Sequence, residues 1–326
     1  MSGNMLLFSL TVFPLFLYFM IIMSKKMNFI DKPNSRKIHK AAIVNISGLT
    51  ISLYLLIVIG ASEYSSHLEN IIALGFILSL IGFFDDRVEM KPSTKFFLTL
   101  FPVSYLILNG YNLTDLGKYE YVHYIYLGKF SIPFTFLAVM LLVNAINYID
   151  GTDGLLIGYS ITSLLYFYFL ADKNSQFLNL ILIFVYILIV CLIFNFLPIK
   201  SGLKSFVGDS GSLFISFFLS FTLIFLYKYM DIHPAFLIWA CWLPVYDFLH
   251  VTFNRLKLKN NFTHPDNSHL HHYILNFFSN SHVKTFLLIN FINLAIICFG
   301  YFICLKVGKI YSLSLFAGLY FLYIFI

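Results

Sequence analysis

Long apolar runs, separated by short polar stretches, make up most of the chain. A transmembrane helix needs about 20 apolar residues. Eleven runs approach that length, although the fourth, fifth and last are short. They lie near residues 5–23, 41–60, 68–84, 95–109, 132–148, 155–171, 177–197, 211–230, 233–252, 284–304 and 310–326. The pattern predicts an all-α polytopic membrane protein with about eleven transmembrane helices, built as a single domain over residues 1–326.

Composition agrees with this prediction and excludes an ordinary soluble protein. Sixty per cent of the residues are hydrophobic and 11% are charged, against about 25% charged in soluble domains. The net charge of +6 would suit a nucleic-acid partner, but the positions of the charges indicate membrane topology instead, so we expect no nucleic-acid binding. The four cysteines stand inside apolar runs without paired spacing, which indicates core residues, not disulfides or zinc ligands.

The basic residues predict how the chain crosses the membrane. No Lys or Arg precedes the first run, whereas Lys25 and Lys26 follow it. This order argues against a cleavable signal peptide and places the N-terminus outside. The loops that this start assigns to the inner side hold 15 of the 21 Lys and Arg residues. The positive-inside rule therefore predicts a multi-pass protein of the inner or plasma membrane, with its basic loops in the cytoplasm.

One outer loop has a pattern of its own. Residues 119–126, YEYVHYIY, alternate aromatic residues with others. Alternation predicts a strand or hairpin at the membrane interface. An aromatic belt is the simpler alternative.

Acidic residues gather at one side of the predicted bundle. Six of the 15 carboxylates fall at inner ends of predicted helices: Asp85, Asp86, Asp150, Asp153, Asp209 and Asp247. A carboxylate at a membrane boundary is costly, so it usually has a partner or a function. One such Asp alone would more simply be a solvated loop residue, but three acidic motifs on one face favour a site for a divalent cation. Oxygen ligands without Cys favour Mg²⁺, with Mn²⁺ as the second choice.

Small residues flank two of these acids. Glycines stand on both sides of Asp153 and of Asp209, which would let the backbone approach a phosphate. Helices that begin near Gly154 and Gly211 would also point free N–H groups at an anion. We therefore expect a phosphate site, although the GDSG string alone is a weak motif.

A second inner loop, residues 253–283, carries three histidines. His269, His271 and His272 fall within four residues in PDNSHLHH. Histidines near neutral pKa can donate hydrogen bonds to phosphate oxygens. We favour this role over a zinc site, for which no fourth ligand is evident, and over a purely structural role.

The first inner loop, DKPNSRKIHK, is a basic patch that includes Lys37 and His39. It either reflects the positive-inside rule alone or gathers anionic substrates at the lipid surface.

Five motifs, taken in order, make the chain resemble the polyprenyl-phosphate N-acetylhexosamine-1-phosphate transferases of glycosyltransferase family 4. They are DKPNSRKIH, GFFDDRVEMKPSTK, NAINYIDGTDGL, FVGDSGS preceded by a helix-ending Asn195, and PDNSHLHH. Each motif alone is weak, but five in family order are specific, and they extend from Asp31 to His272. The histidine loop and the eleventh helix resemble the undecaprenyl-phosphate GlcNAc-1-phosphate transferase branch more than the peptidoglycan translocase.

The resemblance implies a reaction. An N-acetylhexosamine 1-phosphate, with GlcNAc-1-phosphate as first choice, passes from a UDP-sugar to undecaprenyl phosphate, and UMP leaves. The lipid diphosphate sugar would start a cell-surface polysaccharide, such as lipopolysaccharide O-antigen or a cell-wall glycan. The resemblance implies magnesium as cofactor and the UDP-sugar, undecaprenyl phosphate and the lipid bilayer as partners. Other UDP-N-acetylhexosamines and a homodimer remain open.

Position within the motifs assigns the residues to roles, again as the resemblance implies. The catalytic set is Asp85, Asp86, Asp150, Asp153 and His269. The substrate-binding set is Lys37, His39, Lys95, Asn147, Asn195, Asp266, His271 and His272. The metal set is Asp209, Asp153 and Asp86, with Asp209 as the first choice of ligand.

The role of Asp85 can also be argued from chemistry. The second pKa of a phosphomonoester is about 6, so at neutral pH the lipid phosphate is mostly dianionic and already nucleophilic. We therefore favour Asp85 as a group that positions magnesium or the nucleophile, with a general-base role as the alternative.

The chain departs from the family pattern at three places. AAIVNISGL follows the first basic loop where Pro and Gly-Gly are usual, Thr99 stands near a common Gln position, and Asn267 replaces the usual Arg. Asn267 would weaken one phosphate contact or alter the sugar preference, but the metal motifs are intact. The alternative class is an ion-coupled transporter, whose acids would lie nearer the bilayer midplane.

Overall fold

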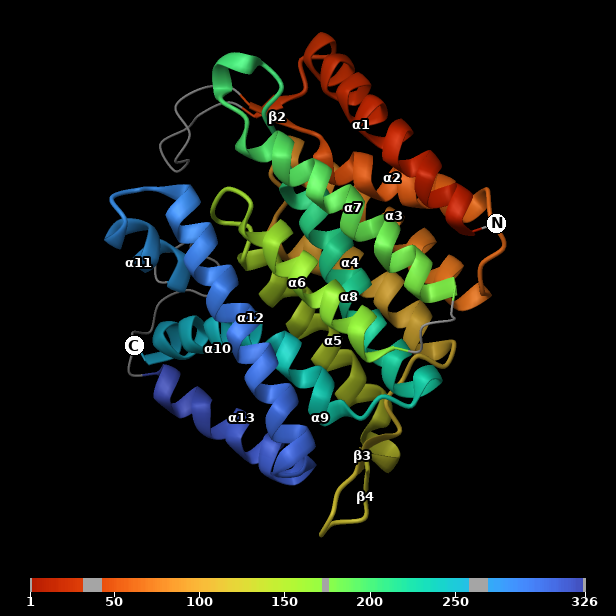
Figure 1. The fold of residues 1–326 in the computed structure, drawn as a ribbon, viewed down its shortest axis with the longest axis vertical. Coiled ribbons are helices and arrows are strands. Elements are labelled where there is room, and N and C mark those ends of the chain that lie inside the picture. The colour runs from red at the N-terminus through yellow and green to blue at the C-terminus, as the bar shows by residue number, and fades with distance from the viewer. Residues whose placement is uncertain (1, 32–42, 172–175, 258–268, 325–326) are drawn as a thin grey trace. The chain divides into compact units, whose positions relative to one another are not determined.

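The computed structural model describes residues 2–31, 43–171, 176–257 and 269–324, and over these ranges the chain is mainly helical (Figure 1). Each of the eleven predicted apolar runs coincides with a helix over most of its length. In lipid this is expected, because a helix satisfies its backbone hydrogen bonds within one segment.

Seven helical segments of the described chain are long and apolar enough to cross a bilayer. They are Phe8–Lys26, Ser66–Val88, Gly128–Tyr148, Gln176–Phe196, Gly208–Met230, Pro234–Lys257 and His282–Lys306. Three shorter apolar helices are Ser47–Gly60, Pro92–Leu108 and Leu155–Leu170. The prediction of a polytopic helical membrane protein is confirmed, while the number eleven and the orientation stay predictions.

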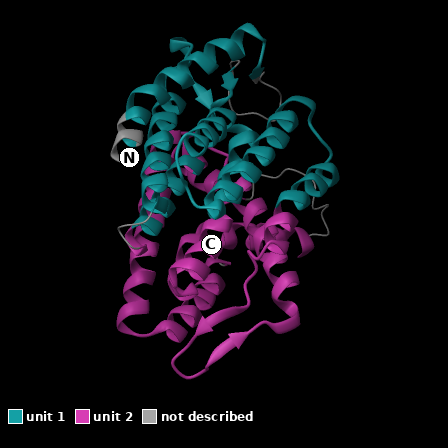
Figure 2. Ribbon diagram, turned by 90° about the vertical axis from the view of Figure 1, so that its right-hand side faces the viewer, with its two compact units in different colours: residues 1–102, 156–168, 172–219 teal, residues 103–155, 169–171, 220–326 magenta. Residues whose placement is uncertain are grey.

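The chain forms two compact units, which are coloured separately in Figure 2. Unit 1 comprises residues 1–102, 156–168 and 172–219, and unit 2 comprises residues 103–155, 169–171 and 220–326. Each unit has its own core and its own set of predicted site residues, and each is described by itself below.

Unit 1 is built from helices around a very small sheet. Its elements are α1 (Ser2–Lys26), β1 (Ile30–Asp31), β2 (Ile43–Asn45), α2 (Ser47–Gly60), α3 (Ser66–Val88), the first part of α4 (Pro92–Leu108), most of α6 (Leu155–Leu170), α7 (Gln176–Phe196), the 3-10 turn η2 (Ile199–Ser201), β5 (Ser205–Phe206) and the first half of α8 (Gly208–Met230). Its core contains packed phenylalanines, including an edge-to-face pair of Phe184 and Phe218 with ring centroids 5.0 Å apart.

The sheet of unit 1 corrects one prediction. The apolar run 41–60 was expected to be helical throughout, but its described residues begin with strand β2, which pairs antiparallel with β1 and parallel with β5. The β-branched Ile43 and Val44 are buried there, which favours a strand. Because β2 leads into α2 and β5 leads into α8, the parallel pairing sets the starts of these two helices side by side.

Unit 2 contains the remaining helices and a hairpin. Its elements are the end of α4, β3 (Asp115–Lys118), β4 (Tyr124–Tyr126), the 3-10 turn η1 (Gly128–Phe130), α5 (Ser131–Tyr148), the start and end of α6, the second half of α8, α9 (Pro234–Leu237), the 3-10 turn η3 (Ile238–Cys241), α10 (Trp242–Lys257), α11 (Leu270–Phe277), α12 (His282–Lys306) and α13 (Lys309–Tyr323). Helix α11 was not predicted, because its eight residues give only two turns of pattern inside a polar loop.

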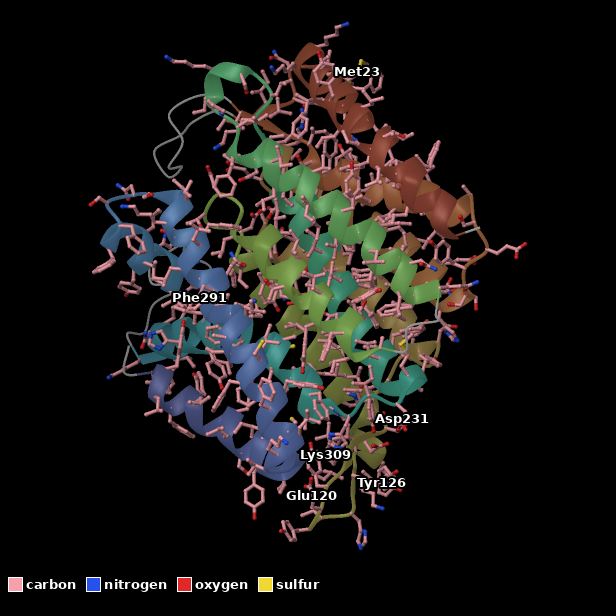
Figure 3. The ribbon with its side chains drawn as sticks, viewed as in Figure 1. Met23, Glu120, Tyr126, Asp231, Phe291 and Lys309 are labelled. Carbon is pink, nitrogen blue, oxygen red and sulfur yellow. The ribbon has the colours of Figure 1, made fainter. Side chains whose placement is uncertain are left out.

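The hairpin β3–β4 was predicted in part. Tyr124–Tyr126 forms the second strand as expected, but the first strand begins earlier, at Asp115, with Asp115 opposite Tyr126. Glu120, between the strands, accepts the backbone N–H groups of Lys309 at 2.7 Å and Ile310 at 3.2 Å. These N–H groups belong to the first turn of α13, so the hairpin caps that helix (Figure 3).

Candidate active site

Glycines allow the first turn of α8 to lie against α2 and α3. A Cβ atom added to Gly48 would lie 2.1 Å from the backbone nitrogen of Gly211, and one added to Gly82 would lie 2.2 Å from the carbonyl oxygen of Asp209. Such distances are shorter than real Cβ contacts, so only glycine fits at these crossings. Asp85 and Asp86 follow Gly82 by about one helical turn, which brings both acids to the start of α8.

Asp86 caps α8 from a different helix. Its Oδ1 accepts the N–H of Asp209 at 3.1 Å, and its Oδ2 accepts the N–H of Ser210 at 3.3 Å. The first N–H groups of a helix have no partner within that helix, and a negative charge there is favoured by the helix dipole. Asp86 therefore has a positioning role that its motif did not indicate, and its predicted catalytic and metal-binding roles stay predictions.

Lys95 joins the other two acids of unit 1. Its Nζ lies 2.8 Å from Oδ2 of Asp85 and 3.0 Å from Oδ2 of Asp209. The second carboxylate oxygen of Asp85 accepts the N–H of Met90 at 2.8 Å, in the turn that follows α3. We call Asp85, Asp86, Lys95 and Asp209 the acidic cluster. It assembles four predicted site residues from three helices.

The acidic cluster fits a hard divalent cation. Asp85 and Asp209 each direct one carboxylate oxygen at the same cationic atom, so their charges converge as metal ligands do. No group of three His, Cys, Asp or Glu side chains with metal-site geometry occurs in the described part of the chain. Mg²⁺ suits such a sparse set, because it is usually held by one or two carboxylates together with water and substrate phosphates.

Of the other predicted substrate-binding residues outside unit 2's motifs, Asn195 is described by the structure. Asn195 is buried near the end of α7, where its Nδ2 lies 3.5 Å from the backbone oxygen of Ser205 in β5. Lys37 and His39 lie outside the described residues, as does Asp266 of the histidine loop.

The motif NAINYIDGTDGL forms the end of α5 and the turn into α6. Asn147 is in the last turn of α5, and its carbonyl accepts the N–H of Asp150 at 3.3 Å. Helix α6 begins at Leu155, directly after Gly154 with φ +74°, as predicted. Helix α8 begins at Gly208, three residues before the predicted start.

Asp153 in this turn is next to a residue of α12. Its backbone N–H donates to Nδ1 of His282 at 3.3 Å, and its carboxylate oxygen Oδ1 lies 3.8 Å from the same nitrogen. His282 is the first residue of α12 and belongs to none of the five motifs. The sequence offered no signal for this contact, because nothing in the pattern pairs residues 129 positions apart.

The three histidines of PDNSHLHH lie together, while their predicted role in binding phosphate stays a prediction. The rings of His269 and His271 are nearly parallel, with centroids 5.5 Å apart, and those of His271 and His272 are 4.2 Å apart. The ring of Tyr148, at the end of α5, lies 5.5 Å from that of His269. We call His269, His271 and His272 the histidine cluster. It lies in unit 2 with Asn147, Asp150 and Asp153.

His271 is the most enclosed of the three. Only 3% of its surface is exposed, and its Nε2 has no hydrogen-bond partner among the described residues. A Cβ atom on Gly151 would lie 2.0 Å from this nitrogen, so the imidazole lies directly against the acidic turn. Burial, with a smaller effect of His272, lowers the pKa of His271 from 6.5 to about 3. The ring is therefore neutral at physiological pH.

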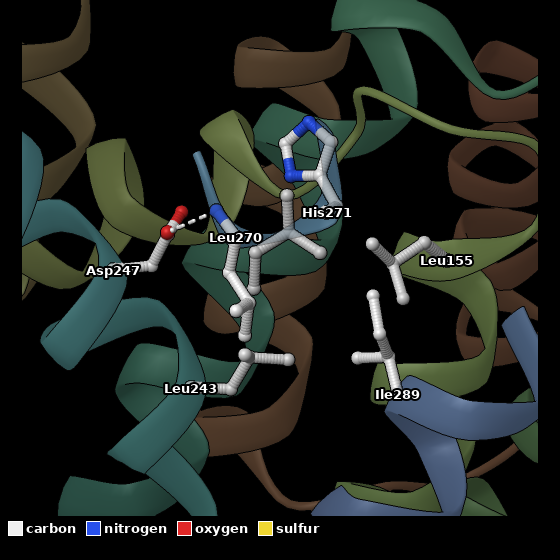
Figure 4. A pocket seen from close by; sticks show the side chains of 7 residues that line it. Leu155, Leu243, Asp247, Leu270, His271 and Ile289 are labelled. Atoms are coloured by element: carbon white, nitrogen blue, oxygen red, sulfur yellow. Dashed lines mark hydrogen bonds between the residues drawn. The ribbon is translucent and has the colours of Figure 1, made fainter. Parts of the chain in front are cut away.

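A small cavity lies next to His271 (Figure 4). It is lined by Ile149, Leu155, Leu243, Asp247, Leu270, His271 and Ile289. Five of these side chains are aliphatic, so the cavity offers few polar groups to a ligand. Asp247 is at one side of it and binds the backbone of Leu270.

Asp247 is the main residue that the sequence did not assign. It was noted as one of six inner acids but received no role. In the structure its Oδ2 lies 2.7 Å from Nδ1 of His269, and only 4% of Asp247 is exposed. The sequence did carry one signal, because Asp247 is an acid late in an apolar helix, shortly before a histidine motif. A buried charge needs a partner, and the histidines could supply one.

The family model of glycosyl transferase family 4 matches residues 68–227. This segment contains the whole acidic cluster and the motif NAINYIDGTDGL, while the histidine cluster lies beyond it.

Curated relatives extend the similarity. The chain is 28% identical over 258 residues to the probable undecaprenyl-phosphate N-acetylglucosaminyl 1-phosphate transferase of Bacillus subtilis (strain 168), covering 77% of this chain and 71% of the relative. It is 28% identical over 277 residues to the undecaprenyl-phosphate alpha-N-acetylglucosaminyl 1-phosphate transferase of Escherichia coli (strain K12), covering 80% and 73%. The chain is 27% identical over 284 residues to the protein of the same name from Yersinia pestis, covering 83% of this chain and 78% of the relative. These findings confirm the resemblance and give the transporter alternative no support.

Proposed function

We propose, on the premise that this chain belongs to glycosyl transferase family 4, that it transfers a sugar 1-phosphate to undecaprenyl phosphate. The donor in this proposal is a UDP-N-acetylhexosamine, in first place UDP-GlcNAc, and the products are UMP and a lipid diphosphate sugar. One observation carries the proposal within the structure. Lys95 and the carboxylates of Asp85 and Asp209 form one charged cluster at the start of α8.

The reaction explains why such a cluster is useful. An oxygen of the lipid phosphate attacks the phosphorus that carries the sugar, and the bond from this phosphorus to the oxygen of UMP breaks. Both reactants are anions, so their approach is opposed by charge repulsion. The ammonium group of Lys95 can offset this repulsion at the phosphates.

Magnesium is the proposed cofactor. When bound, it would supply charge neutralisation at the diphosphate and fix its orientation. Asp209 and Asp85 would hold it, because their oxygens already converge on one cationic atom. Asp153 and Asp86 stay proposed ligands from the motifs, and Asp86 contributes in addition by holding the backbone of Asp209.

The contacts of Asp85 favour positioning over proton abstraction. One oxygen accepts the N–H of Met90 and the other faces Lys95, so both are engaged. The dianionic lipid phosphate, with a second pKa of about 6, needs little activation. We therefore propose that Asp85 orients Lys95 and the metal, while a general-base role remains the alternative.

The wider setting follows from the same proposal. UDP-sugars are cytoplasmic, which agrees with the inner-side positions that the basic residues predict for the motifs. Asn147, Asp150 and His269 from unit 2 would contribute to binding the nucleotide and phosphates, and the product would start a cell-surface polysaccharide. The homodimer stays an open proposal.

The proposal can be tested with the purified full-length protein in lipid nanodiscs. Radiolabelled UDP-GlcNAc, undecaprenyl phosphate and Mg²⁺ should give UMP and a lipid diphosphate GlcNAc, identified by mass spectrometry. Release of UDP in place of UMP would mean that a different bond breaks and would contradict the proposal. A panel of other UDP-N-acetylhexosamines, with and without lipid phosphate as the control, would define the sugar.

A further inference from the structure

His269 is held by a set of hydrogen bonds that extends beyond the five motifs. Its Nδ1 lies 2.7 Å from Oδ2 of Asp247, which is in α10. The other oxygen of Asp247 accepts the N–H of Leu270 at 2.8 Å and the hydroxyl of Tyr323, in α13, at 3.2 Å. All four residues belong to unit 2.

This geometry fixes the tautomer of the ring. An ionised carboxylate can only accept hydrogen bonds, so Nδ1 of His269 must carry the hydrogen in this contact. With the hydrogen on Nδ1, a ring without a second proton has its lone pair on Nε2. The hydrogen bond made by one ring nitrogen thus decides the chemistry of the other.

We propose that Asp247 and Tyr323 are positioning residues that hold His269 as its Nδ1–H tautomer and so present Nε2 as a hydrogen-bond acceptor to a hydroxyl or amide N–H group of the UDP-sugar. The inference rests on the proposed function, which supplies that UDP-sugar. Neither residue lies in the histidine motif, and neither needs to touch the substrate. Both act through His269.

Packing supports this role for the pair. His269 and Asp247 are 6% and 4% exposed, so solvent cannot replace the hydrogen bond between them. The rings of Tyr148 and His271 both lie 5.5 Å from that of His269 and restrict its plane. Packing alone does not choose between the two ring nitrogens, whereas the carboxylate does.

Tyr323 completes the coordination of the carboxylate. It is 9% exposed, and its ring lies 5.7 Å from that of Tyr246 on α10. A buried carboxylate needs several donors, and Asp247 has three: Nδ1 of His269, the N–H of Leu270 and the hydroxyl of Tyr323. The last helix therefore reaches the histidine cluster through one hydroxyl group.

The first test is Asp247→Asn. The amide keeps the shape, but its NH₂ group can donate to Nδ1, which would place the hydrogen on Nε2. We expect kcat to fall on the order of 100-fold, as is usual when the partner of a functional histidine is lost, with KM within about threefold. Nitrogen-15 spectra of histidine-labelled protein should show His269 protonated at Nδ1 in the original chain and at Nε2 in the variant.

The second test is Tyr323→Phe, with Tyr320→Phe as its matched control. Tyr320 lies one turn earlier on α13, and its ring contacts Tyr246. Among the described residues its hydroxyl makes no hydrogen bond to Asp247. We expect kcat to fall on the order of fivefold for Tyr323→Phe, the size of one hydrogen bond, and to stay unchanged for Tyr320→Phe.

The outcomes separate this inference from the proposed function. If the unaltered protein releases no UMP, the proposed function fails, and the nitrogen-15 spectra alone still decide the tautomer. An unchanged tautomer in Asp247→Asn, or equal kcat values for the two tyrosine variants, would overturn the inference. If Asp247→Asn does not fold, the tyrosine pair decides.

Discussion

Lys95 lies between two carboxylates, and this arrangement determines how the acidic cluster should respond to change. Each carboxylate is stabilised by the ammonium group, and each limits where that group can go. Ion pairs that are partly withdrawn from water are costly when only one partner is removed. Substitutions in the cluster should therefore affect both activity and stability.

Asp209→Asn keeps the shape of the side chain but removes its charge. We expect turnover to fall by at least 100-fold and its dependence on Mg²⁺ concentration to weaken, because a charged ligand is lost. The measurement is UMP release across a magnesium series. Asp231→Asn, at the exposed far end of α8, is the matched control and should behave as the unaltered protein. Normal activity of Asp209→Asn at low magnesium would exclude Asp209 as the ligand.

His271 makes the fold sensitive to acid. Burial lowers its pKa to about 3 from an ordinary 6.5, so the unfolded chain binds this proton more readily than the folded one. The stabilising contribution of the neutral ring is complete above pH 6.5 and is lost progressively as the pH falls toward 3. At pH 5 the loss should be on the order of 2 kcal/mol.

Thermal unfolding in detergent between pH 7.5 and 5 measures this effect. His271→Asn, which cannot be protonated in this range, should lose less stability over the interval than the unaltered protein, whatever its stability at pH 7.5. Parallel curves for the two proteins would show that His271 does not cause the acid sensitivity.

The motif residues were predictable from the sequence, but several of their partners were not. The acids and histidines stood out because charged and polar groups are rare in an apolar chain. Asp247 and His282 were missed, because the residues they contact are separated from them by 22 and 129 positions. A contact of this kind depends on how helices pack, and hydropathy carries no information on it.

At the scale of the elements, Gly82 determines how closely α3 approaches α8. Gly82→Ala would place a methyl group 2.2 Å from the carbonyl oxygen of Asp209, against backbone that cannot rotate away. We expect a loss of about 1–3 kcal/mol in the free energy of unfolding, together with lower activity, because the acidic cluster spans this crossing.

Gly318→Ala provides the matched control for that substitution. Gly318 is inside α13, and a Cβ there would meet nothing within 4 Å. The change should be neutral or stabilising, since alanine favours helix by about 1 kcal/mol over glycine. Thermal unfolding and UMP release of both variants measure the difference. Equal stability of the two would mean that the crossing of α3 and α8 tolerates a side chain.

The apolar runs predicted the helices well, because in a bilayer helix length and hydropathy are tied together. The exceptions are short elements. Strand β2 stood at the start of an apolar run and was included in the predicted helix, since three residues give no readable alternation. Helix α11 lay hidden in a polar loop, because it packs only Leu275 and His271 inside.

For the whole molecule, the distribution of basic residues predicts the topology. Lys91→Cys, in the loop after α3, should be protected from a membrane-impermeant maleimide in intact cells, while His123→Cys, in the hairpin loop, should react rapidly. Both positions are exposed. The background needs Cys298→Ser, because Cys298 is exposed whereas the other three cysteines are buried. Reaction at Lys91→Cys but not at His123→Cys would mean that the chain crosses the membrane in the opposite orientation to the predicted one.

The cap that Glu120 forms on α13 has a mechanical consequence. Both its oxygens bind the first turn of a helix that begins 189 residues later. A force applied to the C-terminal end of the chain would load these bonds through α13 before the helix could separate from the hairpin. In single-molecule pulling, α13 should therefore detach in one abrupt step at the hairpin, and Glu120→Ala should lower the force of that step alone.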